Sequence, residues 1–195
     1  MLNDNALTTV TNIKKLLAIE DSNDSKDSYI ERAINTASAI IESLCRRKFK
    51  LAEYTDFVHE DADMLVLDQY PVHGISEDGQ VAASPTLYMD GGIIYRSVKA
   101  KSTITYSAGY TLPNDATEEK PCTLPNDLQN ACERLVSVIY EDDETSSELD
   151  MLGIKSFQLG DLEGDFSAAT NSDVYAWIPA DVMTTIIAHK KALML

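Results

Sequence analysis

The side chains that most often bind metals or carry out acid–base catalysis are scattered along this chain. His59, His73 and His189 are far apart, and none has another histidine or a cysteine at the spacing of a zinc site. The sequence has no glycine-rich phosphate loop, no G-x-S-x-G turn and no catalytic pairing of cysteine with histidine. Acidic residues are so abundant that a pair of carboxylates has no diagnostic value. We therefore expect no enzyme activity and no cofactor.

One short acidic pattern resembles the start of a calcium-binding loop. Asp161, Glu163 and Asp165 alternate with other residues, as the first three ligands of such a loop do. However, Phe166 occupies the position where the loop needs glycine, and Ser172 occupies the position of the final glutamate. The pattern therefore predicts no metal site.

Acidic residues dominate the charge of the chain. It contains 32 aspartates and glutamates against 16 lysines and arginines, which gives a net charge of −16. Over half of this charge lies in residues 141–173, where there are 10 acids and one base, Lys155. A surface of this kind repels nucleic acid. The simplest interpretation of a charge run is a solvated loop, but the length of this segment invites a second interpretation.

Length and composition predict one domain with a core of useful size, since 44% of the 195 residues are hydrophobic. No apolar run approaches the roughly 20 residues that cross a bilayer. The first five residues contain no base and no apolar stretch, so we expect no secretory signal and no membrane contact. Cys45, Cys122 and Cys132 form no C-x-x-C pair, and we expect three free thiols in a protein made in a cytoplasm.

Apolar residues at helical spacing predict four helices. The clearest runs from Ile30 to Leu44, where apolar side chains form one continuous stripe over about four turns, or roughly 21 Å. Pro179 is suited to the first turn of the last helix. The acidic run from Glu141 to Glu144 opposes the dipole of the third helix, which we expect to end before it. The expected helices cover about 8–19, 27–47, 126–140 and 180–194, and a flexible acidic arm covers about 141–173.

The residues between the second and third helices have the pattern of strands. Asp90, Gly91 and Gly92 separate two apolar runs and predict a hairpin turn. We expect about four or five antiparallel strands within about 49–110. The predicted fold class is therefore α+β and mostly helical: a small helical bundle with an inserted antiparallel sheet or hairpin and a C-terminal helix, in one domain over residues 1–195.

Three bases, Arg46, Arg47 and Lys48, end the second helix. Bases at a helix C-terminus interact favourably with the helix dipole. Phosphate binding needs more basic surface than this, and Glu53 and Asp56 are close in the sequence. We interpret the cluster as a helix cap or as one side of an ion pair between subunits.

The order of these elements resembles the head–tail connector, or adaptor, proteins of tailed bacteriophages. The resemblance runs from Leu7 to Leu195 and is carried by five segments in order: residues 7–17, Ile41-Glu42 to Phe49, Leu67 to Pro71-Val72, Ile104 to Tyr110, and Leu124-Pro125. The chain departs from the family pattern in its longer segment Ser76–Tyr95 and in Cys45-Arg46, where the family often has Gly-Arg.

This resemblance implies a structural role in the virion, at the head–tail junction, after assembly in the host cytoplasm. Such proteins form rings of about a dozen copies beneath the portal of the capsid. The ring carries the DNA channel and presents a docking face to a tail-side connector or a tail terminator protein. The expected partners are therefore further copies of the chain, the portal protein, the next tail component and passing DNA that is not specifically bound.

Within that family, three sets of residues have an expected role. Asp161, Glu163 and Asp165 are predicted to line the channel or a subunit interface, where acids repel DNA within a Debye length of about 8 Å. The last helix is predicted to contact the portal. Its contact residues are Val182, Ile186, Ile187 and Leu193. The basic cluster Arg46, Arg47 and Lys48 is predicted to form contacts between subunits.

Three alternatives stay open on the sequence alone. An acidic DNA mimic that inhibits a nucleic-acid enzyme fits the net charge, although residues 1–59 are nearly neutral. A metal-dependent hydrolase that uses carboxylates would be stabilised by Mg²⁺ or Mn²⁺. A tail-completion protein at a neighbouring position in the virion belongs to the same structural class.

Overall fold

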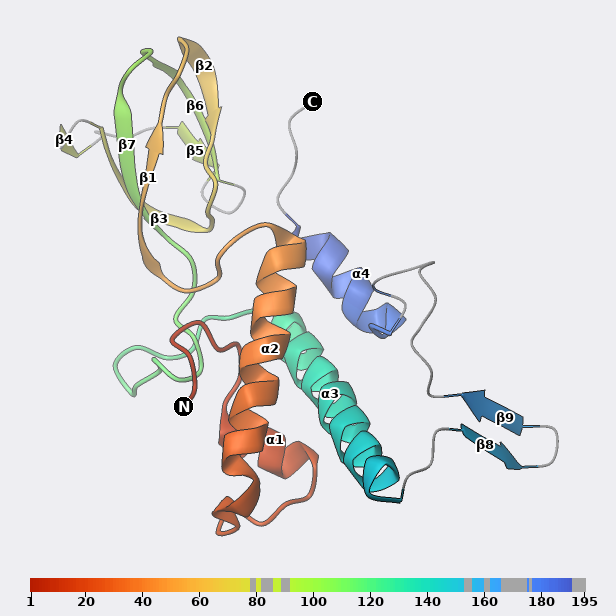
Figure 1. The fold of residues 1–195 in the computed structure, drawn as a ribbon. Helices are drawn as coiled ribbons and strands as arrows, with labels where there is room; N and C mark the ends of the chain where they lie inside the picture. The colour runs from red at the N-terminus through yellow and green to blue at the C-terminus, as the bar shows by residue number, and fades with distance from the viewer. Residues whose placement is uncertain are drawn as a thin grey trace.

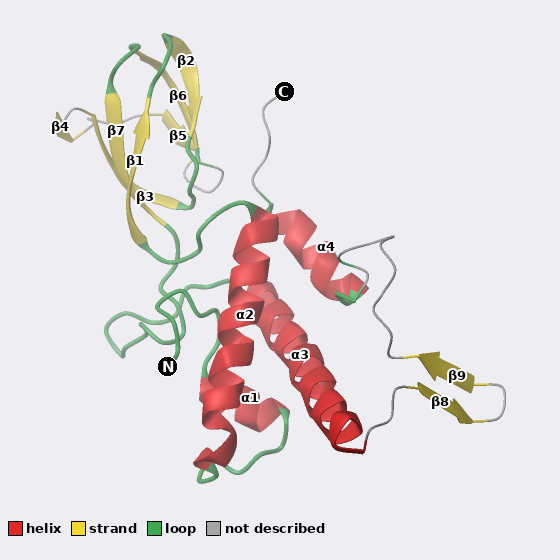
Figure 2. Ribbon diagram, in the orientation of Figure 1, coloured by secondary structure: helices red, strands yellow, loops and turns green. Residues whose placement is uncertain are grey.

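The computed structural model has the α+β architecture that the sequence predicts: a helical bundle, an inserted antiparallel β unit and a C-terminal helix (Figures 1 and 2). It describes residues 1–77, 80–81, 86–88, 92–152, 156–159, 162–165, 175 and 177–190. The β unit lies at one end of the bundle and the hairpin β8–β9 lies to one side of it (Figure 1).

Among the described residues, four α-helices and one short 3₁₀ helix, η1, form the bundle. They are α1 (Val10–Leu16), η1 (Asp24–Lys26), α2 (Asp27–Cys45), α3 (Asn126–Leu152) and α4 (Ala180–His189). Thr9 caps α1 by accepting a hydrogen bond from the backbone N–H of Asn12 at 3.1 Å. Helix α2 ends where Arg46 adopts a left-handed conformation with φ of 56°.

Helix α3 is longer than the sequence predicts. It continues through the acidic run to Leu152, whereas the expected end was Tyr140, so the expected arm 141–173 begins inside a helix. Glutamate, leucine and methionine have high helix propensity. An exposed acid near a helix C-terminus costs only about 0.3–1 kcal/mol, which these propensities offset. Within the rest of the arm, β8 (Ser156–Leu159) and β9 (Leu162–Asp165) form an antiparallel hairpin.

The bundle core lies where α2 packs between the other helices. One row of α2 at four-residue spacing, Ile30, Ile34, Ser38 and Glu42, is almost entirely buried. Tyr29 in the first turn of α2 contacts Tyr140 of α3 edge to face, with ring centroids 5.3 Å apart. Each fully buried isoleucine contributes about 1.5–3 kcal/mol to folding. Apolar burial by α2 therefore holds the bundle together.

The β unit contains two antiparallel sheets, not the single small sheet that the sequence predicts. The first has the order β1-β7-β3-β4 and the second β2-β6-β5. The strands are β1 (Ala52–Phe57), β2 (Ala62–Val66), β3 (Val72–Glu77), β4 (Gln80–Val81), β5 (Thr86–Tyr88), β6 (Ile93–Val98) and β7 (Thr103–Ala108). The predicted hairpin is confirmed, because β5 pairs with β6 across residues 89–92.

The division into two sheets follows from the pairing of β2. Its apolar residues Met64, Leu65 and Val66 pair with β6 instead of with β1, the strand next to it in the sequence. A second core fills the β unit, separate from that of the bundle. It contains Val58, Leu67, Val72, Val98, Ile104, Tyr106 and Ala108.

Two segments of the chain link the bundle to the β unit, and they lie side by side. The outgoing segment, Phe49–Leu51, follows α2, and the returning segment, Gly109–Tyr110, follows β7. The N–H of Tyr110 donates to the carbonyl of Phe49 at 2.7 Å, and the N–H of Leu51 donates to the carbonyl of Tyr110 at 2.8 Å. We call this paired crossing the junction.

The three cysteines are free thiols, as the sequence predicts. Burial raises the pKa of the Cys45 thiol to about 11 and that of Cys132 to about 12. Both therefore stay protonated at neutral pH and act as small buried apolar groups. Cys122 is exposed.

Candidate assembly surfaces

The three bases at the end of α2 have different environments, although they are adjacent in the sequence. Arg46 is exposed, whereas the guanidinium of Arg47 is buried, with its central carbon 3.4 Å from the ring centroid of Tyr70 and 5.0 Å from that of Phe49. Arg47 also donates a hydrogen bond to the Tyr70 carbonyl. Of the three bases, Arg46 and Lys48 are the exposed ones, and a contact of this cluster with another subunit stays a prediction.

Lys48 pairs within its own chain, with a glutamate for which the sequence pattern predicts no ion pair. Its Nζ lies 2.7 Å from Oε2 of Glu42, a residue only 4% exposed. The same carboxylate accepts hydrogen bonds from Nδ2 of Asn5 at 2.8 Å and from the backbone N–H of Phe49 at 3.3 Å. Glu42 therefore ties the N-terminal segment, α2 and the junction together.

The position of Glu42 in the sequence is a signal that the residue is buried and has partners. It falls in the same four-residue row as Ile30, Ile34 and Ser38, and a charged residue in an apolar row is almost never fully buried unless it has partners. Ser38 belongs to the same polar part of the row, where its Oγ accepts a hydrogen bond from the N–H of Leu7 at 3.1 Å. Polar positions in the α2 stripe thus mark where the N-terminal segment is fixed.

We expect Arg47→Ala to lower the free energy of unfolding by about 2–3 kcal/mol, because it removes a desolvated cation that lies against two rings. Arg47→Lys should not restore stability, since lysine has no planar group to stack. Arg46→Ala is the matched control at an exposed position and should change stability by less than about 0.5 kcal/mol. Urea unfolding of the three variants measures the difference, and equal losses for Arg47→Ala and Arg46→Ala would contradict it.

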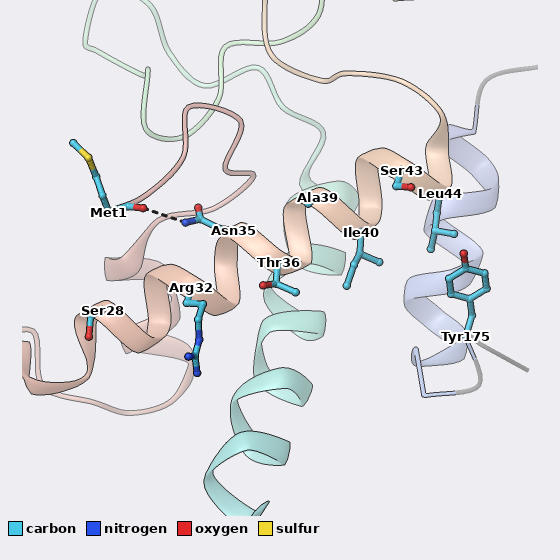
Figure 3. A pocket seen from close by; sticks show the side chains of 10 residues that line it. All are labelled: Met1, Ser28, Arg32, Asn35, Thr36, Ala39, Ile40, Ser43, Leu44 and Tyr175. Atoms are coloured by element: carbon cyan, nitrogen blue, oxygen red, sulfur yellow. Dashed lines mark hydrogen bonds between the residues drawn. The ribbon is translucent and has the colours of Figure 1, made fainter. Parts of the chain in front are cut away.

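The outer face of α2 carries a groove of about 630 Å³ (Figure 3). Its lining includes Ser28, Arg32, Thr36, Ala39, Ser43 and, from outside the helix, Tyr175. Met1 closes one side, where Nδ2 of Asn35 donates to its carbonyl at 3.1 Å. The groove is also lined by Ile40 and Leu44, at the edge of the apolar stripe. Sequence reasoning missed it, because Met1 and Tyr175, which complete its lining, are far from α2 in the sequence.

A second hollow of about 350 Å³ adjoins the groove at the end of α2. Ala39 and Ser43 line both, and the second hollow continues to Arg46 and Lys48. The two together extend along one face of α2 from its first turn to the residues just beyond its end. We call this combined surface the α2 groove.

Helix α4 places the predicted portal-contact residues in two environments. Val182 and Ile186 are 1% and 2% exposed and belong to the bundle core, so they are unavailable for an external contact while α4 is packed. Ile187 is 65% exposed. Leu193 lies outside the described residues. One side of the wide apolar arc attaches α4 to the bundle, and contact of this helix with the portal stays a prediction.

Polar contacts also hold α4 in place. Nε2 of His189 lies 2.7 Å from Oδ2 of Asp127 in the first turn of α3. Partial burial raises the pKa of Asp127, but hydrogen bonds from His189 and from the Leu128 N–H outweigh this effect and lower the pKa below its ordinary value. The Cys45 thiol lies 3.6 Å from the carbonyl of Ile186. Both contacts tie the C-terminal half of α4 to the bundle.

Two of the three predicted channel acids lie in the hairpin β8–β9. Glu163 and Asp165 belong to β9, where they pair in register with Gln158 and Ser156 of β8. Asp161 lies outside the described residues. In the part of the chain that the structure describes, no three histidine, cysteine or acidic side chains gather closely enough to hold a metal ion. No helix in that part is both long and apolar enough to span a membrane.

Comparison with known proteins gives a family and a fold. No curated protein matches this sequence. A chain from the neck of an empty gene transfer agent particle, solved with C6 symmetry, has a TM-score of 0.57 and 16% identity, over 100% of this chain and 97% of that one. A chain from the virion of a native gene transfer agent particle has a TM-score of 0.55 and 14% identity, over 100% of this chain and 95% of that one.

The profile of the head completion protein family matches residues 6–150. This range includes α1, α2, the β unit and nearly all of α3, so the elements that build the bundle, the junction and the α2 groove lie within it. The match confirms the resemblance to head–tail connector proteins that the order of the elements indicates. The chain belongs to the head completion protein family.

Proposed function

We propose that the chain is a structural protein of the virion neck, where copies of it form a ring between the portal and the tail. One observation carries this proposal: the family match over residues 6–150, in a chain whose fold is similar along its whole length to a chain from a particle neck. A ring of about a dozen copies surrounds the path of the DNA. No catalytic step belongs to this role.

The charge of the chain supports a channel through which DNA passes without binding. A net charge of −16 per copy gives a dozen copies roughly two hundred negative charges before counterion screening. Phosphates are repelled by such a wall within a Debye length of about 8 Å at physiological salt. In this proposal Asp161, Glu163 and Asp165 face the channel or a subunit interface.

The experiment that tests the proposed function compares particles made with and without this chain. The expected result is that complete particles carry the chain at the neck, as seen by labelling and electron microscopy. Without it, heads and tails should accumulate separately. Normal, infectious particles formed in its absence would refute the proposal.

Reversing the charge of Asp161, Glu163 and Asp165 to lysine should reduce the yield of infectious particles at least ten-fold, because the three cations would retain passing DNA. The triple alanine variant is the matched control, and its yield of infectious particles should fall much less. Plaque or transduction counts measure the effect. An unchanged yield of the lysine variant would remove these acids from the channel.

Ile187→Glu should weaken capture of the portal protein at least ten-fold in a pull-down, because Ile187 is the exposed apolar residue among the described members of the predicted contact. Leu16→Glu, at a 52% exposed leucine of α1, places the same charge on another part of the bundle and should leave capture unchanged. Deleting α4 is a poorer test, since it also removes Val182 and Ile186 from the core. Undiminished capture by Ile187→Glu would exclude this contact.

A further inference from the structure

The hairpin β8–β9 is a sheet of only two strands. Strand β8 pairs with β9, and neither pairs with a third strand among the described residues. The hairpin lies to one side of the helical bundle (Figure 1). Two strands alone are at best marginally stable in water and need further strands or a surface to pack against. The outer edges of β8 and β9 carry backbone N–H and C=O groups that can pair with another strand.

The register of the hairpin sorts its residues by polarity. Cross-strand partners lie on the same face of a sheet, and successive residues alternate between the two faces. One face carries Ser156, Gln158, Glu163 and Asp165. The other face carries Phe157, Leu159, Leu162 and Gly164. One wet face and one covered face are typical of an antiparallel sheet at the boundary between water and a packed layer.

A second copy of the hairpin supplies a matching strand. The open strands of the β unit lie beyond the junction, whereas β8 begins just after the far end of α3, a helix of 27 residues that is about 40 Å long (Figure 1). Strands β8 and β9 are equal in length, so pairing β9 of one copy with β8 of the next continues both faces of the hairpin. In copies related by rotation around a ring, these two strands run antiparallel, as they do within the hairpin.

We propose that the hairpins of neighbouring copies pair edge to edge and close into one antiparallel sheet around the path of the DNA, with the polar face inside. The proposal rests on the proposed ring and names the strands that join its copies. The contact is heterologous, β9 to β8, and closure leaves no open edge. Every copy then contributes Glu163 and Asp165 to the inner wall, and the apolar face lies outward, toward the bundles.

The dimensions of such a closed sheet suit a DNA channel. About a dozen hairpins provide about 24 strands, and a strand spacing of about 4.8 Å gives a circumference of about 115 Å. The backbone wall is then about 37 Å across, and strand tilt widens it further. Closed sheets of about 16–18 strands already enclose a water-filled channel. The closed sheet therefore has room both for a duplex and for acidic side chains on its inner wall.

Cross-linking of two single-cysteine variants tests this sheet in assembled particles. Gln158→Cys places a thiol on β8 and Glu163→Cys places one on β9, each in a Cys122→Ser background, while Cys45 and Cys132 are buried. Particles assembled from equal amounts of the two variants are treated with a short bis-maleimide. This reagent bridges cross-strand neighbours, which are at most about 8 Å apart. Every link joins two different chains, because each chain has one accessible thiol on the hairpin.

The expected product is a dimer that contains up to about half of the chains, since about one neighbouring pair in four has its two thiols on facing strands. Particles made from either variant alone should give at least ten-fold less dimer, because β8 faces β9 at every contact. Equal dimer yields from single-variant and mixed particles would overturn the closed sheet. Mixed particles that carry the chain but give no dimer would overturn it as well. Absence of the chain from particles would instead refute the proposed place in the neck.

Discussion

Gly109→Ala should lower the free energy of unfolding by at least about 3 kcal/mol, a large part of the 5–15 kcal/mol typical of a domain. Gly109 has φ of +107°, a conformation that residues with a side chain rarely adopt. A methyl group there would lie 2.5 Å from the carbonyl oxygen of Lys50 and 2.8 Å from that of Phe49. Both obstacles are backbone, so the two segments of the junction would have to separate.

Gly74→Ala is the matched control. It adds the same methyl group in β3 of the same sheet, where the nearest atom is Oγ of Ser107 at 3.6 Å and φ is not positive. We expect a change of less than about 1 kcal/mol, since removing a strand glycine also lowers the entropy of the unfolded chain. Urea unfolding followed by circular dichroism compares the two. Similar midpoints for the two variants would show that the junction tolerates separation.

Glu42→Ala is expected to cost about 3–5 kcal/mol of stability, because it removes one member of a buried, hydrogen-bonded charge cluster. The buried N–H of Phe49 loses the carboxylate that accepts its hydrogen bond, and Lys48 and Asn5 lose theirs. Glu42→Gln keeps the shape of the side chain and one acceptor oxygen, so its loss of stability should be smaller. The measured quantity is the free energy of unfolding from urea titration.

Glu31→Ala supplies the comparison within the same helix. Glu31 pairs with the N-terminal amino group of Met1, which is fully exposed, and an exposed ion pair contributes about 0–1 kcal/mol. The ratio of the stability lost in Glu42→Ala to that lost in Glu31→Ala therefore measures how much burial strengthens the contribution of a glutamate. If Glu42→Ala were as mild as Glu31→Ala, the carboxylate would not be the link between the N-terminal segment and the junction.

Sequence patterns predicted the elements whose residues interact locally. The stripe from Ile30 to Leu44 gave α2, because apolar burial along one face fixes both the helix and its orientation. The glycine pair at 91–92 gave the hairpin β5–β6, because a tight turn needs a left-handed residue, here Gly92 with φ of 66°. Such features depend on neighbours within a few residues.

Features that depend on distant partners were missed or wrongly placed. The burial of Arg47 depends on Tyr70, 23 residues away, and the burial of Val182 depends on the other helices of the bundle. The number of sheets depended on whether β2 pairs with β1 or with β6, which no local pattern distinguishes. The extent of α3 was misjudged because the helix dipole was given more weight than the propensities of Glu and Leu.

The junction makes the β unit an insertion whose entry and exit meet at one place. Residues 49–51 and 109–110 are paired by hydrogen bonds, so a short turn could connect them directly and leave the bundle core intact. The bundle could then be kept unchanged while the β unit, which has its own core, is replaced by another unit. β units of other sizes could be grafted at this point without redesign of the bundle.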